Sequence, residues 1–84
     1  MERGSYLLIE PGMSVTGLDG SIGNVAEVVA DADVDVFRGI VVSYGLLAAK
    51  RVMIGADDII GVDEREVSVN IHKADVDHMP TVAA

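Results

Sequence analysis

Apolar and polar residues alternate over several short stretches of this chain. The clearest alternation covers residues 66–71, where Val67, Val69 and Ile71 would share one face of a strand. A shorter alternation begins at Met13, and turn-forming residues separate the other apolar segments. The pattern predicts strands near 13–16, 22–30, 35–44, 50–54 and 66–71.

The first predicted reversal of the chain lies at Asp19 and Gly20, between two apolar, β-branched segments. Glycine permits the positive φ that a tight hairpin requires, so this dipeptide indicates a turn. Gly23 and Gly39 lie within the predicted strands, where glycine marks a bend or a close approach of two backbones. These features predict an all-β fold: a small, strongly bent antiparallel β-barrel of five to six short strands.

Helical structure is expected at two places only. Asp57 or Asp58 would cap a short helical turn near 57–60. The C-terminal residues are polar and then small, and they are compatible with a short helix before Pro80. We therefore expect three parts, namely an N-terminal arm (1–11), a barrel domain (12–72) and a C-terminal tail (73–84).

The middle strands are apolar on both faces. Val25 and Val29 would point away from Ile22 and Val28, and residues 40–42 are consecutively apolar. The core of so small a domain covers one sheet face only, so either the arm or another copy of the chain must cover the second face. We expect a homodimer, because two-fold pairing is the commonest oligomer. The predicted interface residues are Tyr6, Leu7, Leu8, Val28 and Val41.

The arm itself carries the apolar segment 6–9, which ends shortly before Pro11. This segment either plugs the barrel core or anchors an interface. We favour an interface or a domain-swapped arm, because the segment precedes the proline and lies outside the barrel pattern.

Composition narrows the possible partners. The chain has 84 residues, with 14 acidic against 6 basic side chains and a net charge of −8. Nucleic-acid binding depends on clustered Lys and Arg, so direct binding of DNA or RNA is not expected. The N-terminal apolar run is too short for a signal peptide or a membrane span, and cysteine is absent. We therefore expect a cytoplasmic protein without membrane insertion.

Two clusters have the residue types of a metal site. Asp31, Asp33 and Asp35 have the spacing that opens a calcium loop, but Val36 and Val42 occupy the positions that require glycine and glutamate. A solvated acidic turn is the favoured interpretation.

The second cluster comprises His72, Asp75, Asp77 and His78. Imidazole and carboxylate groups can ligate zinc, but this spacing matches no recognised motif. An exposed polar tail is favoured. His72, Asp77 and His78 remain the candidates for metal binding from this cluster.

No catalytic arrangement emerges from the sequence. Both histidines lie within the last 13 residues, outside the barrel pattern, so no Ser–His–Asp triad is supported. Gly17, Gly20 and Gly23 recur every third residue, but a strand follows them in place of the helix that a phosphate-binding loop requires. We expect neither an enzyme nor a bound cofactor.

Residues 12–71 resemble the PRC-barrel family in the order and spacing of several segments. These segments are GMSV at 12–15, DGSIGNVAEVVAD at 19–31, RGIVVS at 38–43, VMI at 52–54, DDI at 57–59, VD at 62–63 and VSV at 67–69. Gly55 departs from the family, which often has proline after the fourth strand. The resemblance implies a small β-barrel that acts as a protein-interaction module. We thus expect a non-enzymatic adapter that self-associates and docks a protein partner; the alternative is a sensor for a small ligand or a divalent metal.

Overall fold

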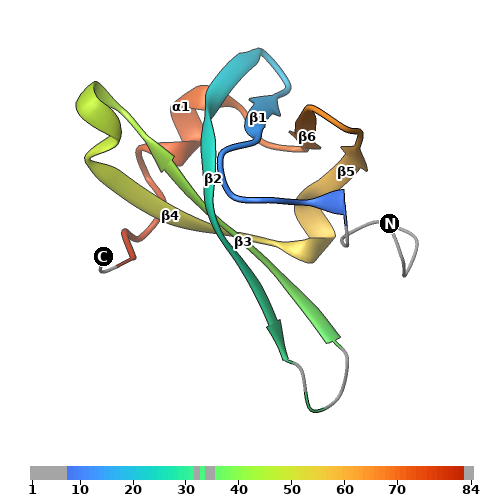
Figure 1. Ribbon diagram of the computed structural model, residues 1–84. Helices are drawn as coiled ribbons and strands as arrows, with labels where there is room; N and C mark the ends of the chain where they lie inside the picture. The colour runs from blue at the N-terminus through green and yellow to red at the C-terminus, as the bar shows by residue number, and fades with distance from the viewer. Residues whose placement is uncertain (1–7, 32, 34–35, 83–84) are drawn as a thin grey trace.

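A computed structural model describes residues 8–31, 33 and 36–82 (Figure 1). Its described part forms one six-stranded sheet with the order β4-β3-β2-β1-β6-β5, strongly curled into a half-barrel. Short 3-10 turns follow β3 and β4, and a single turn of α-helix follows β6. The elements are β1 (Ser14–Gly17), β2 (Gly20–Asp31), β3 (Val36–Tyr44), η2 (Leu46–Ala48), β4 (Lys50–Gly55), η3 (Ala56–Asp58), β5 (Ile59–Val62), β6 (Glu66–Val69) and α1 (Lys73–Val76).

The predicted fold class is confirmed, and the predicted helical segments appear as η3 and α1. The helical turn ends earlier than expected, because Ile59 and Ile60 already belong to strand β5. Pairing is antiparallel between sequence-adjacent strands, but β1 and β6 run parallel, with Ser14 opposite Glu66. A short turn forces antiparallel pairing, whereas β1 and β6 have no direct connection to impose it. The sheet is therefore mixed.

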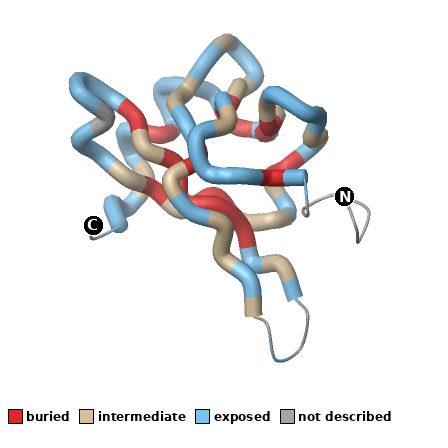
Figure 2. The backbone as a smooth tube through the Cα atoms, viewed as in Figure 1, coloured by how far each residue is buried: buried red, intermediate tan, exposed pale blue. Residues whose placement is uncertain are grey.

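The core lies on the concave side of the curled sheet and is mostly aliphatic, with the ring of Tyr44 also buried in it. Val67, Val69 and Ile71 are all buried, so the alternation over 66–71 faces the core as predicted. No polar or charged residue is buried in the described part of the chain. Figure 2 shows the buried positions gathered toward the middle of the molecule, whereas the far ends of the β2–β3 hairpin are intermediate or exposed.

The central part of strand β3 is buried on both faces. Ile40 and Val42 are fully buried in the core, and Val41 is only 4% exposed although it lies outside that core cluster. In the sheet, Val41 is paired with Glu27 on one side and Met53 on the other. The second face is thus covered at Val41 within a single copy, whereas the sequence had left either the arm or another copy to cover it.

Glycines permit the sharp curvature at two of the predicted positions. A Cβ atom at Gly23 would overlap the carbonyl oxygen of Ser43, and one at Gly39 would overlap that of Ile54. The β2–β3 pairing also shifts register twice, between Val25 and Glu27 and between Val29 and Ala30. Such irregularities increase local twist and bend the strand.

The C-terminal residues close one end and one edge of the half-barrel. Val76 of α1 is buried, and Thr81 forms a bridge with Val52 on the edge strand β4. The N–H of Val82 also donates to the carbonyl of Arg51 at 2.7 Å. No helix among residues 8–31, 33 and 36–82 is long and apolar enough to cross a membrane.

Candidate interaction surface

The connection between β3 and β4 presents two adjacent leucines to solvent. Leu46 is 87% exposed and Leu47 is 92% exposed. Gly45 enters the connection with φ 82°, and Leu47 has φ 59° and ψ 24°. This left-handed conformation costs roughly 1–2 kcal/mol for a residue that carries a Cβ atom. We call residues 45–48 the leucine tip.

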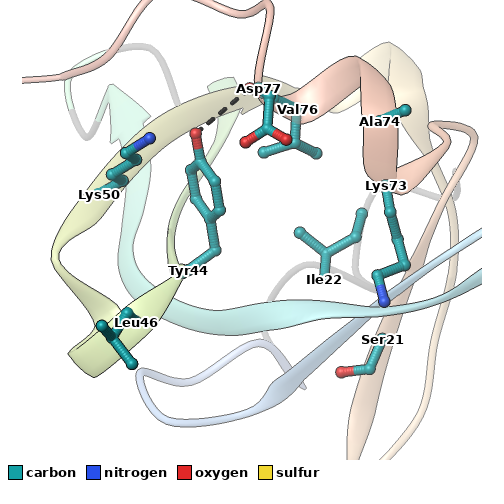
Figure 3. A pocket seen from close by; sticks show the side chains of 10 residues that line it. Ser21, Ile22, Tyr44, Leu46, Lys50, Lys73, Ala74, Val76 and Asp77 are labelled. Atoms are coloured by element: carbon teal, nitrogen blue, oxygen red, sulfur yellow. Dashed lines mark hydrogen bonds between the residues drawn. The ribbon is translucent and has the colours of Figure 1, made fainter.

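A groove of about 550 Å³ lies beside the leucine tip, between the start of β2, the end of β3 and helix α1 (Figure 3). The ring of Tyr44 and the side chains of Ile22 and Val76 provide its apolar lining. Leu46 lies at the margin, so the leucine tip and the groove form one continuous surface. The lining residues are Ser21, Ile22, Tyr44, Gly45, Leu46, Lys50, Lys73, Ala74, Val76 and Asp77.

Strand pairing and helix docking together position the groove walls. Gly23 pairs with Tyr44, which places the start of β2 beside the end of β3. The hydroxyl of Tyr44 donates to the carbonyl oxygen of Val76 at 3.4 Å, and this bond links β3 to α1. At the N-terminal end of α1, the N–H of Lys73 donates to the carboxylate of Asp19 at 2.8 Å.

The charge of the groove differs in sign from that of the chain. Two amines, Lys50 and Lys73, and one carboxylate, Asp77, lie among the lining residues. The groove therefore carries a net charge of +1 in a chain whose net charge is −8. All three residues are exposed, so water screens these charges.

The acidic turn predicted as a possible calcium loop is the end of the β2–β3 hairpin. Asp31 accepts the N–H of Asp33 at 3.1 Å and lies 3.8 Å from the guanidinium of Arg38. Its carboxylate therefore already stabilises the turn. Asp35 lies outside the described residues.

The predicted histidine cluster does not converge on one point. His72 Nδ1 lies 3.9 Å from the carboxylate of Asp19, and Asp77 lines the groove. The backbone N–H of His78 donates to the carbonyl of Asp75. In the part of the chain that the structure describes, no group of three or more His, Cys, Asp or Glu side chains could hold a metal ion.

The residues predicted for an interface differ in how accessible they are. Leu8 is 52% exposed, whereas Val28 is partly buried against the core and Val41 is almost fully buried. Val41 therefore offers little surface to a partner. Tyr6 and Leu7 lie outside the described residues. Ile9, which follows Leu8, is buried in the core, so this end of the arm contributes to the barrel interior.

Sequence reasoning missed Leu46 and Leu47. The available signal was a glycine followed by two consecutive leucines in a connection between two predicted strands. Connections are usually polar, so paired leucines in one were a sign of an exposed apolar surface.

Comparison with known proteins adds no assignment. Neither the models of protein families nor the curated proteins include a significant match to this chain. The resemblance to the PRC-barrel family therefore stays a prediction.

Proposed function

We propose that this chain is a non-enzymatic, PRC-barrel-like interaction module that docks onto protein through its leucine tip. The observation that carries this proposal is the conformation of Leu47, which combines a left-handed backbone with a side chain that is 92% exposed. The described residues of this copy cover almost none of the Leu47 side chain, so burial within the copy does not offset these costs. A protein partner that buries the Leu47 side chain would offset these costs.

The magnitudes support a docking role. Burying one leucine side chain stabilises a complex by about 1.5–3 kcal/mol, so the two leucines supply about 3–6 kcal/mol before the cost of association. Scattered exposed apolar residues are normal on protein surfaces. Two neighbouring leucines lie beside a groove of mixed apolar and polar lining, and exposed apolar patches of this kind mark interaction sites.

The chemistry of the groove favours binding over catalysis. General acids and bases are tuned by partial burial and by close charged neighbours. Lys50, Lys73 and Asp77 are exposed residues on an open groove. This setting suits the polar rim of a protein interface, where charges surround an apolar centre.

Photo-crosslinking tests the proposal directly. The photoreactive residue p-benzoylphenylalanine would replace Leu47 in cells that express the chain naturally, and a matched variant would carry it at Ile60. Ile60 is also exposed, at 62%, but lies on β5 at the opposite edge of the sheet from β4. We expect a discrete protein adduct from position 47 and none of the same mass from position 60. Absence of any adduct specific to position 47 would refute docking through the leucine tip.

A further inference from the structure

We infer that the protein docked by the leucine tip is a second copy of this chain, with the Leu47 side chain of each copy seated in the groove of the other. This inference rests on the proposed function and names its partner. The two copies thus form a dimer with a two-fold axis, in which the Leu47 side chain of each copy occupies the groove of the other.

The exposed Leu47 side chain projects from the leucine tip directly beside the groove. A two-fold interface joins the same patch on both subunits, so that patch must be complementary to itself. Leu46 lines the groove and Leu47 is the next residue along the tip. A two-fold axis passing between tip and groove would therefore fill both grooves at once.

The groove lining suits a leucine side chain. Half-buried Ile22 supplies accessible apolar surface above the buried Tyr44 ring and Val76, and the stems of Lys50 and Lys73 extend it at the margins. The volume of about 550 Å³ lies within the range typical of binding pockets and accommodates an inserted side chain.

Charge also favours a second copy at this surface. Lys50 and Lys73 occur together with Asp77, so a two-fold arrangement can bring the amines of one copy toward the carboxylate of the other. The chain as a whole carries −8, and two copies repel each other through most orientations. Cross-pairs between the amines of one copy and Asp77 of the other offset the repulsion that the net +1 charge of each groove would otherwise cause.

Because the chain contains no cysteine, engineered disulfides can report the contact without background. One purified variant, Leu47→Cys, would carry a size tag and be mixed with untagged Ala74→Cys. Ala74 is exposed and lines the groove. Mild oxidation should give the mixed disulfide dimer at least tenfold faster than a control mixture of Leu47→Cys with Ile60→Cys. Equal rates in the two mixtures would overturn the inference.

Sedimentation equilibrium gives an independent measurement. The wild-type chain should dimerise with concentration, and Leu47→Asn should raise the dimer Kd at least tenfold while the circular dichroism spectrum stays unchanged. Ile60→Thr, which removes an exposed apolar side chain elsewhere, should leave the Kd within twofold of wild type. A wild-type chain that stays monomeric up to about 500 μM would overturn the inference, since the free energy of dimerisation would then be weaker than about −4.5 kcal/mol.

The two experiments separate failure of the inference from failure of the proposed function. A photo-crosslink from position 47 to a different protein, without selective disulfide formation, would overturn the second copy and leave docking by the tip intact. If neither a photo-crosslink from position 47 nor a selective disulfide forms, both the second copy as partner and docking by the leucine tip are overturned.

Discussion

The carboxylate of Asp19 accepts a hydrogen bond of 2.8 Å from the backbone N–H of Lys73, 54 residues further along the chain. Asp19 belongs to the β1–β2 turn and Lys73 is the first residue of α1. The first N–H groups of a helix lack partners within that helix, and His72 provides no side-chain cap. A turn residue thus caps a distant helix and fixes one wall of the groove.

Replacing Asp19 should loosen α1. We expect Asp19→Ala to lower the free energy of unfolding by about 1 kcal/mol, because the cap is lost. Asp19→Asn keeps an acceptor oxygen and should cost less. Urea denaturation monitored by circular dichroism measures both values. Equal stability of Asp19→Ala and wild type would show that water replaces the carboxylate without loss.

Two glycines that face each other across β3 and β4 should respond in opposite ways. Gly39 has φ 150° and no room for a Cβ atom, because the carbonyl oxygen of Ile54 occupies that space. Its partner Gly55 has φ −68° and open space around the Cβ position. Gly39→Ala should destabilise by about 2–5 kcal/mol through overlap and strain. Gly55→Ala should stabilise by about 0.4–1 kcal/mol through the unfolded state. Thermal and urea unfolding of both variants measure the contrast, and similar effects would contradict it.

Leu47 should lower the stability of the free chain while it strengthens the binding of a partner to the leucine tip. Asparagine tolerates the left-handed conformation better than leucine, so Leu47→Asn should raise the free energy of unfolding by about 1 kcal/mol. Leu46→Asn is the matched control. Leu46 is equally exposed, but Leu47 alone has positive φ among the described non-glycine residues. Stability of the control should change by less than about 0.5 kcal/mol. Unfolding must be measured at low protein concentration, so that self-association does not contribute.

The turn between β5 and β6 should contribute a pH-dependent stability. The N–H groups of Arg65 and Glu66 donate to Asp63 Oδ1 at 2.7 and 2.8 Å and lower the pKa of Asp63 below its ordinary value of 3.8. The ionised carboxylate therefore stabilises the fold above the unfolded-state pKa, and this contribution is lost as the pH falls through the folded-state pKa. Asp63→Asn keeps an acceptor but does not titrate. The Tm advantage of wild type over this variant should shrink between about pH 5 and pH 2. Parallel Tm curves would contradict the assignment.

Local signals predicted the local structure well. The alternation over 66–71 places Val67 and Val69 in the core, since neighbouring side chains of a strand point to opposite faces. The Asp19–Gly20 turn could also be predicted, because a tight turn depends on the conformations of two adjacent residues. Strand ends were less accurate: β2 extends from Gly20 to Asp31, and pairing with β3 supports its outer residues.

The candidate site could be predicted only in part. Val41 was expected at an interface because three consecutive apolar residues exceed what one core face can accept. In the folded chain both faces of β3 are covered at that position. Conversely, Leu46 and Leu47 lie in a predicted connection, which was a sign of exposure, but only the folded backbone showed that both side chains reach solvent. Exposure depends on the whole chain and is not a property of any short segment.

The sequence by itself therefore determined a small, mostly β fold, its hairpin turns, its aliphatic core strands and its acidic charge, all of which follow from composition and short-range periodicity. Only the tertiary structure decided the parallel pairing of β1 with β6, the capping of α1 by Asp19 and the groove beside the leucine tip. These features join segments that are far apart in the chain. Their contacts depend on how the curled sheet closes, and no local pattern encodes that.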